Sequence, residues 1–258
     1  VLLIAIGLDI IIGRRSAWGT LIGVLLGIVL VASVAWLIIS MPMIGQMNNF
    51  DVFNQSINNA KSAVIELNDV AGNMQISSGA SAGNLVDAHI RHFSNDNISS
   101  NDYVVQDGRG YYQIKTHGFY VYAASGINTT APDRDVKLTS NIPLELDSSL
   151  VMGNLGLNLS ELDINKLNAE TVMGRLVVDL PRSGFKQGTI NMVMGQVVIN
   201  VPRGANVRIQ TSTVIVPVSF PEGFAREGNT VYSLTPDSSQ PMMLDVSNVM
   251  GVITVQYR

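Results

Sequence analysis

Three segments of the chain repeat one pattern: VMGNLGLNLS at residues 151–160, VMGRLVVDLP at 172–181 and VMGQVVINVP at 193–202. Each segment begins 21 residues after the one before it, and Val-Met-Gly occurs a fourth time at 249–251. Beyond each glycine, apolar residues occupy every second position, which is the period of a β-strand with one buried face. The apolar columns are Leu155, Leu176 and Val197; Leu157, Val178 and Ile199; and Leu159, Leu180 and Val201.

The pattern extends to both sides of each glycine. Residues 72–76 and 251–255 share its reduced form, a glycine followed by alternating apolar residues, and the residues before the glycines also align at the 21-residue spacing. Each unit is therefore predicted to be a strand, a kink at the glycine, a second strand and a turn. A unit this small cannot bury its apolar face alone, so neighbouring units must stack and share a core.

This stacking predicts a mainly β protein in which one chain coils into a β-solenoid. The rungs are expected to lie about 4.8 Å apart, the spacing of paired strands, and the glycine column marks a corner where a Cβ atom would clash. The alternative is a β-sandwich with repeating hairpins, because residues 203–248 interrupt the period. An open solenoid end exposes unpaired backbone groups, so we expect a cap or self-association there.

Composition narrows the classes of function. The 258 residues are 47% hydrophobic and 14% charged, and the mean hydropathy is +0.27, which indicates that part of the chain lies in lipid. The chain has 16 basic and 20 acidic residues, a net charge of -4 and no basic run, so nucleic acid is not an expected partner. Absence of cysteine excludes disulfides and thiolate chemistry, and with only 3 histidines an enzyme is disfavoured.

The apolar residues are concentrated near the N-terminus. No charged residue occurs between Ala17 and Phe50, and residues 21–39 read LIGVLLGIVLVASVAWLII. About 20 helical residues cover the hydrocarbon core of a bilayer, and a tryptophan near each end favours the interface. We therefore predict a spanning helix over 18–40 within a membrane region over 1–40. A buried core helix and an export signal are the alternatives.

A short apolar segment precedes this helix. Residues 1–12 contain Asp9 and are too short to span, so we interpret them as the truncated end of another membrane helix. The loop over 13–17 carries two arginines, which favour the cytoplasmic side. The spanning helix then leads outward, through a linker over 41–60, to an extracytoplasmic domain over 61–258. Asp9 is either a functional intramembrane charge or an interfacial partner of a nearby arginine.

Two long stretches of the chain resemble a known family. AVIELNDVAGNMQISSGASAGNLVDAHIRH at 63–92 and NIPLELDSSLVMGNLGLNLSELDINKLNAETVMGRLVVDLP at 141–181, after the apolar segments, resemble bacterial membrane proteins of the LiaF-like group. The outer portion of these proteins is similar to the toast-rack or adhesin-type β-solenoid domain. The resemblance implies an accessory membrane regulator of a two-component system that responds to cell-envelope stress. It implies no catalytic residue.

One motif formally matches a catalytic pattern. Residues 79–83 read Gly-Ala-Ser-Ala-Gly and match the G-x-S-x-G nucleophile elbow of hydrolases around Ser81. An elbow joins a strand to a helix, whereas the residues that follow here alternate like a strand. We therefore predict a turn at this position and no catalytic serine.

The histidines offer a second chemical interpretation. His89 and His92, close to Asp87, could form a metal-binding group. Residues three apart on a strand face opposite sides, so the two imidazoles are not expected to bind one ion. We predict solvated strand histidines at these positions. His117 is predicted to be a lone residue in a turn.

The repeat generates two more columns of possible ligands. The polar column consists of Asn158, Asp179 and Asn200. Calcium needs several carboxylate or carbonyl oxygens, so a column with one carboxylate predicts an outward amide ladder rather than a calcium site. The residue before each glycine is a methionine, expected to pack adaptably at the corner rather than to bind a soft metal. These residues are Met152, Met173, Met194 and Met250.

Aromatic residues gather in one stretch with few charges. They are Tyr103, Tyr111, Tyr112, Phe119, Tyr120 and Tyr122. Packing in the core or on a sheet face is the expected role of these side chains. A contact surface for a glycan or a protein is the alternative.

These observations predict a membrane-anchored, non-enzymatic bacterial envelope protein without catalytic, cofactor or metal sites. The expected function is that of an accessory regulator or interaction scaffold in the envelope stress response. The alternative is an adhesin-like or glycan-binding surface module. The expected partners are the membrane, a membrane sensor kinase or a cell-wall polymer, and a further copy of the chain.

Overall fold

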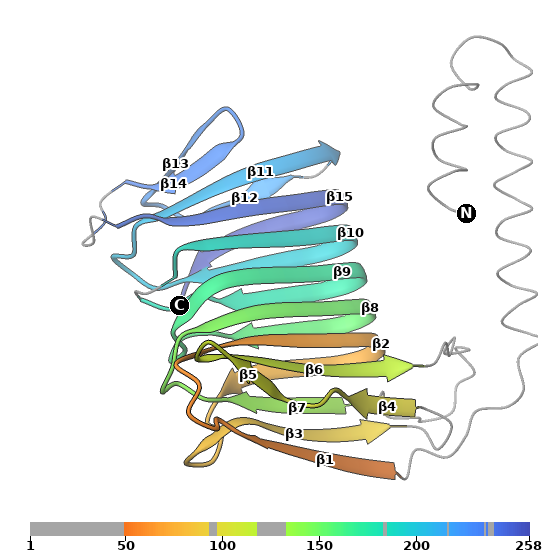
Figure 1. The fold of residues 1–258 in the computed structure, drawn as a ribbon. Coiled ribbons are helices and arrows are strands. Elements are labelled where there is room, and N and C mark those ends of the chain that lie inside the picture. Colours follow the sequence, from red (N-terminus) through yellow and green to blue (C-terminus); the bar gives the residue numbers. More distant parts are fainter. Residues whose placement is uncertain are drawn as a thin grey trace, which may run out of the picture. The chain divides into compact units, whose positions relative to one another are not determined.

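The structure is a computed structural model that describes residues 49–92, 97–117, 133–182, 185–215, 217–234, 236 and 240–258. The regular elements in these ranges are strands, numbered β1 to β15 (Figure 1). In these ranges no helix is long and apolar enough to span a membrane. The predicted membrane region over 1–40, including Asp9, lies outside the described residues.

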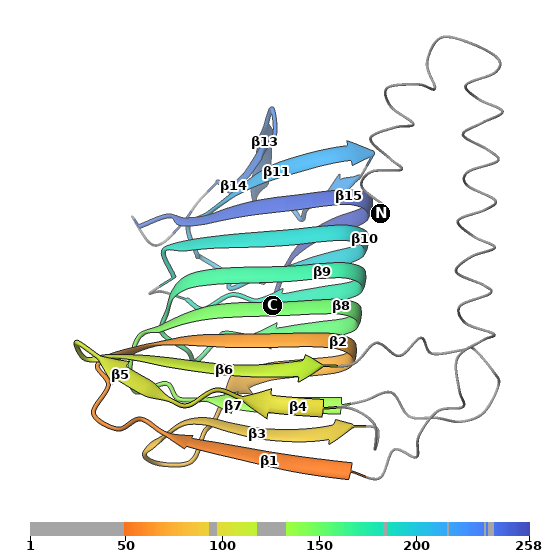
Figure 2. The ribbon, with the colours of Figure 1, turned by 45° about the vertical axis from the view of Figure 1, so that its right-hand side comes forward.

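Five long strands form the body of the described part. They are β2 (Ser62–Ser78), β8 (Leu144–Asn158), β9 (Ile164–Asp179), β10 (Gln187–Val201) and β15 (Met242–Tyr257). Neighbours in this order pair in parallel, and each strand bends sharply at a glycine near its middle (Figure 2). We refer to one bent strand as a rung.

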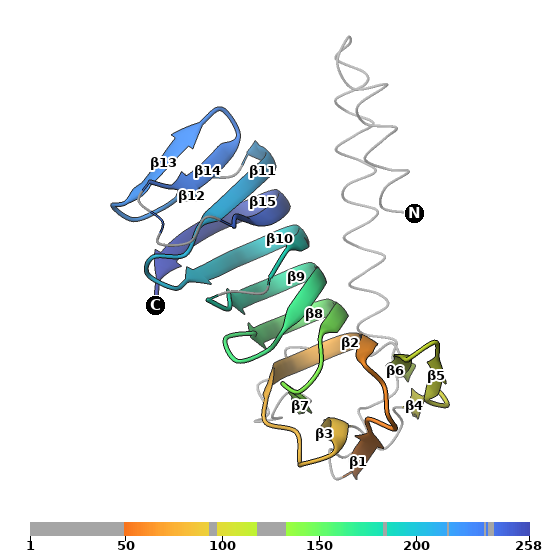
Figure 3. The same cartoon turned by 60° about the vertical axis from the view of Figure 1, so that its left-hand side comes forward.

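Ten shorter strands extend the sheet beyond the first and the last rung (Figure 3). The strands between β2 and β8, together with the strand that precedes β2, are β1 (Asn49–Ser56), β3 (Asn84–His92), β4 (Asn97–Ser100), β5 (Val104–Gln106), β6 (Arg109–His117) and β7 (Asp133–Leu138). The strands between β10 and β15 are β11 (Val207–Ile215), β12 (Val218–Ser219), β13 (Phe224–Glu227) and β14 (Thr230–Ser233).

The repeated tripeptides stack on one another. Gly153 pairs with Gly174, Gly174 with Gly195, and Gly195 with Gly251, while Gly72 of β2 pairs with Gly153 on the other side. Consecutive units are thus parallel and in register, as predicted for a solenoid, and not hairpins of a sandwich.

The interruptions of the period are insertions between rungs. Hydrogen-bonded side chains on adjacent rungs are 21 residues apart between β9 and β10, but 81 apart between β2 and β8 and 56 apart between β10 and β15. The additional residues form β3 to β7 in the first case and β11 to β14 in the second. β15 then returns to lie between β10 and β11, paired with both.

Each bend requires a residue without a side chain. The φ angles of Gly153, Gly174, Gly195 and Gly251 lie between 135° and 142°, a region that L side chains rarely adopt. A Cβ atom on Gly174 would lie 1.8 Å from the carbonyl oxygen of Gly153, and the other stacked glycines show the same contact. The glycine column is therefore fixed by both backbone conformation and close approach.

The two arms of each rung face each other across a narrow apolar core. All nine residues of the predicted apolar columns are buried, with 0 or 1% of their surface exposed. The arm before the bend contributes matching rows, among them Leu146 paired with Leu167. Because corresponding residues of successive rungs lie directly above each other, the core is continuous from β2 to β15.

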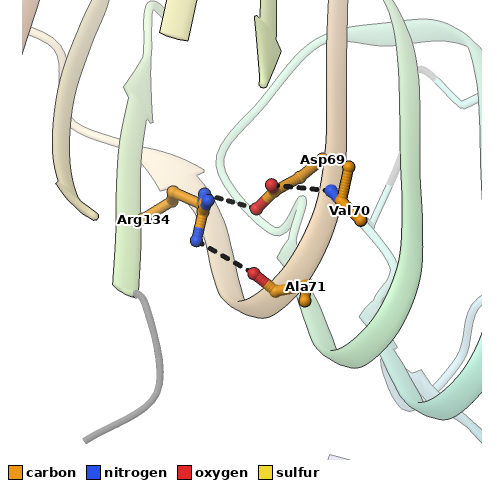
Figure 4. Close-up of polar contacts among 4 residues, drawn as sticks. All are labelled: Asp69, Val70, Ala71 and Arg134. Carbon is orange, nitrogen blue, oxygen red and sulfur yellow. Dashed lines mark hydrogen bonds and ion pairs between the residues drawn. The ribbon is translucent and has the colours of Figure 1, made fainter. Parts of the chain in front are cut away.

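A buried ion pair closes the first rung. β6 pairs with β2 over Ser62–Asn68 and β7 pairs with it over Asn73–Ser78, so neither reaches the bend between. Arg134 of β7 reaches this bend: its guanidinium pairs with Asp69 and donates a hydrogen bond of 3.1 Å to the carbonyl oxygen of Ala71 (Figure 4). The side chains of Asp69 and Arg134 are 1% and 3% exposed.

Two boundaries predicted from sequence are corrected. β1 lies within the predicted linker over 41–60. Its residues alternate between exposed and half-buried, but the sequence is rich in Asn and Gln and shows no clear apolar alternation that would have indicated a strand. His117 is the last residue of β6 and not a lone turn residue, since the segment from Arg109 continues as a strand paired with β2 and β4.

Replacing a stacked glycine should destabilise the whole stack. Gly174→Ala places a methyl group against a backbone carbonyl, which cannot move without breaking the register of two rungs. Gly228→Ala is the matched control, because its φ of 59° is also positive but nothing lies within 4 Å. We expect a loss of about 1–2 kcal/mol for the control and a clearly larger loss for Gly174→Ala, measured by urea denaturation. A loss for Gly174→Ala no larger than that of the control would show that contact with the neighbouring carbonyl adds nothing.

Breaking the buried pair should cost more than replacing it. Arg134→Met removes the guanidinium that offsets the charge of the buried Asp69 carboxylate, and breaking a buried ion pair in this way costs about 3–5 kcal/mol. The double variant Asp69→Leu/Arg134→Met should recover much of this loss, since Leu150 occupies the same column in the next rung. Denaturant unfolding of both variants measures the difference. A double variant no more stable than Arg134→Met would show that the buried charge of Asp69 is not the cause of the loss.

Candidate interaction surface

The G-x-S-x-G motif forms a turn, as predicted. Ser81 lies in the connection between β2 and β3, and its side chain is exposed. Its backbone N–H donates to Oδ2 of Asp87 at 2.6 Å, and Nδ2 of Asn84 donates to Oδ1 of the same carboxylate at 2.6 Å. Hydrogen bonds from Ser81 and then from Asn84, with a smaller charge interaction from the nearby His89, hold the pKa of Asp87 below its ordinary value of 3.8. The carboxylate therefore organises the turn.

The two histidines of β3 face opposite sides, as predicted. His89 is exposed, whereas His92 is 4% exposed and its Nε2 lies 3.2 Å from Oδ2 of Asp51. The prediction that both are solvated is wrong for His92, because β1 pairs beside it and supplies Asp51. No group of three or more acidic or histidine residues in the described ranges is arranged to bind a metal ion.

The polar column forms a hydrogen-bonded ladder on the outer face of the second arm. Nδ2 of Asn200 donates to Oδ1 of Asp179, and Nε2 of Gln256 donates to Oδ1 of Asn200 at 2.8 Å. Asn158 instead accepts a bond of 2.6 Å from the hydroxyl of Ser160. The predicted amide ladder is confirmed for the later rungs and gains Gln256 from the fourth repeat.

The outer face of the first arm carries a second polar column. Oδ2 of Asp147 accepts a hydrogen bond of 3.3 Å from Nδ2 of Asn168 on the next rung. Partial burial raises the pKa of Asp147, and the carboxylates of Glu66 and Glu170 add to this effect. The two arms therefore present polar side chains in rows set by the rung spacing.

The aromatic stretch packs mainly into the structure. Tyr112 is buried, and Tyr103 meets it edge to face at a ring separation of 6.3 Å and donates from its hydroxyl to the carbonyl oxygen of Ile57 at 2.8 Å. Tyr111 is 40% exposed, with the guanidinium of Arg109 5.5 Å from its ring centre. Phe119, Tyr120 and Tyr122 lie outside the described residues.

The methionines before the glycines are exposed, which corrects their predicted role in packing. Between 40 and 55% of the surface of each is exposed, and between 41 and 46% of the surface of each preceding valine. The cause is the glycine bend, which turns both residues before it outward from the core. We call this set the Val–Met ridge; it consists of Val151, Met152, Val172, Met173, Val193, Met194, Val249 and Met250.

The ridge follows the outer edge of the bends from β8 to β15 (Figure 2). At about 4.8 Å per rung, its first and last rows are about 14 Å apart. Apolar side chains that are exposed singly are normal on a protein surface, whereas a contiguous exposed row marks an interaction site. We therefore identify the ridge as the candidate functional surface.

A sequence signal for the ridge is present in the repeat. In a strand with one buried face, two consecutive apolar residues cannot both point to the core. Each unit nevertheless has Val and Met side by side directly before its glycine. In a regular strand, either the valine or the methionine would have to be exposed, and the bend exposes both.

The turn at Ser81 should make stability depend on pH. Because the pKa of Asp87 is lowered in the folded protein, its carboxylate stabilises the fold fully above the unfolded pKa and loses this effect as the pH falls through the folded pKa. Asp87→Asn should therefore be less stable than the natural protein at pH 7, and the gap should close in acid. Thermal unfolding from pH 7 to pH 2 measures it; a gap that stays constant with pH would contradict this role.

Comparison with known proteins supports the stacked-rung fold. No curated protein matches the chain. A solved structure of a candidate cell adhesion protein from Clostridium sporogenes aligns with a TM-score of 0.69 at 20% identity, covering 81% of this chain and 99% of that one, and shows the same fold. A candidate adhesin from Bacteroides fragilis aligns with a TM-score of 0.19 at 8% identity, covering 84% of this chain and 100% of that one.

A family model matches residues 44–200, which include β1 and the rungs β2, β8 and β9 in full. The family is described as the N-terminal domain of toast_rack, DUF2154. This match covers more than half of the chain and agrees with the in-register rungs and their glycine bends. The chain therefore belongs to the toast-rack family.

Proposed function

We propose that this protein is a membrane-anchored, non-enzymatic envelope protein and acts as an accessory regulator in the response to cell-envelope stress. Its toast-rack domain is a rigid scaffold through which other envelope components are contacted. The observation that carries this proposal is the Val–Met ridge, a row of exposed apolar side chains held at fixed spacing by the rungs.

Two features of the described residues support a scaffold. The arms of the inner rungs are hydrogen-bonded on both sides, so the surface side chains are held on a rigid lattice. The motif that resembles a catalytic site has a structural role, because Ser81 and Asp87 bond to each other in a turn. These features favour binding over chemistry.

Membrane anchoring is supported by sequence. Residues 21–39 form an uncharged apolar run of the length that spans a bilayer, and the arginines at 14 and 15 favour a cytoplasmic loop before it. The family match begins at residue 44, directly after this region. The toast-rack domain is then expected outside the cytoplasm, where envelope stress is sensed.

An adhesin-like or glycan-binding module is the second candidate function. The ladder of Asp179, Asn200 and Gln256 favours it, since amides and carboxylates in a flat row are groups that bond sugar hydroxyls. The solved structure from Clostridium sporogenes is described as a candidate cell adhesion protein. In this case the partner is a cell-wall polymer.

Deleting the gene should change the bacterial response to antibiotics that block cell-wall synthesis, measured with a stress-responsive promoter. The natural chain should restore the response, and Val172→Ser/Met173→Ser/Val193→Ser/Met194→Ser should not, because it removes the centre of the ridge. Met243→Ser is the matched control, as its side chain is also exposed but lies outside the ridge.

An unchanged response after deletion would refute the regulatory function. In that event, binding of the full chain in detergent to purified wall polymer supports the adhesin-like candidate.

A further inference from the structure

We propose that the Val–Met ridge lies against the outer surface of the lipid bilayer. This inference rests on the membrane anchoring proposed above, and it adds an orientation: the bent edge of the rungs faces the lipid. The rows of polar side chains on the two arms then remain available to other partners.

The fold itself does not require the ridge. A bend needs only its glycine, whose α-carbon touches the neighbouring rung. In the four later rungs the two residues before the glycine are exposed, whereas in β2 they are Val70 and Ala71, of which Ala71 is buried. A small residue therefore suffices at the bend. Each of the four later rungs nevertheless has a valine and a methionine there, and at least 40% of the surface of each of these residues is exposed.

The chain that leads to the predicted membrane helix joins the stack at this same edge. β1 begins at Asn49 on the side of the bends, as Figures 1 and 2 both show. Residues 41–48 separate this point from the predicted helix over 18–40, and at no more than about 3.6 Å per residue they reach about 29 Å. A tether of this length allows the bent edge of the stack to reach the lipid.

The edge also carries few charges. Within two residues of a Val–Met pair, only Glu170 and Arg175 are charged. An interfacial surface with little charge binds by burying apolar side chains and needs no anionic lipid.

The absence of cysteine from the natural chain permits a direct test. Met173→Cys is labelled with an environment-sensitive fluorophore, and the full chain is reconstituted in phosphatidylcholine vesicles with lipids that carry a nitroxide quencher near the headgroup. Glu161→Cys is the matched control: it is exposed and lies in the turn at the opposite end of a rung, between β8 and β9. Both substitutions are at exposed positions, so both variants should fold.

We expect a blue shift and strong quenching of the label at 173, weak quenching at 161, and the same result at Met194→Cys. Replacing part of the phosphatidylcholine with phosphatidylglycerol should leave the difference unchanged. Whether the chain floats with the vesicles in a density gradient measures membrane anchoring independently of the fluorescence.

Two results would overturn the orientation while leaving the anchoring intact. In the first, the chain floats with the vesicles but the labels at 173 and 161 are quenched equally and weakly. In the second, the label at 173 is protected from water only by a second labelled copy of the chain, which energy transfer between copies detects. A chain that does not float removes the anchoring and this inference with it.

Discussion

The contact between stacked glycines controls the rest of this structure. At each bend an α-carbon lies against the carbonyl oxygen of the glycine one rung before, at a distance that excludes any side chain. This contact aligns the rungs, because a shift by one residue would bring a Cβ atom onto the backbone. Alignment in turn places the residues at equivalent positions of the repeat in rows. Apolar rows lie inside, amide and carboxylate rows lie on the arms, and valine and methionine lie along the bends. Surface and core thus follow from one backbone constraint.

The ends of the stack show how that constraint is relaxed. Among the described strands, none pairs with the outer side of the bend of the first rung, and the guanidinium of Arg134 lies there, next to Asp69. A buried ion pair is weak evidence for stability in general, but here the same guanidinium also donates a hydrogen bond to the backbone carbonyl oxygen of Ala71 at the bend. The inserted segment from β3 to β7 is therefore a structural part of the toast-rack domain and not a peripheral addition.

The interior of the domain was predictable from the sequence, and much of its edge was not. The apolar columns, the glycine corner and the turn at Ser81 follow from local periodicity, which one chain segment reveals by itself. β1, the burial of His92 and the position of Arg134 depend on pairing between segments far apart in the sequence, for which the sequence carries no local signal. The exposure of the methionines depends on the direction of the bend, which a period of two residues does not specify.

β15 lies between β10 and β11, although β11 precedes it in the chain. During synthesis, the site next to β10 must therefore remain unoccupied while β11 to β14 are made, and β11 has no parallel partner until β15 arrives. The domain cannot grow rung by rung from one end to the other. Its completion is an insertion event: β15 must enter between β10 and β11 after both of these strands have been made.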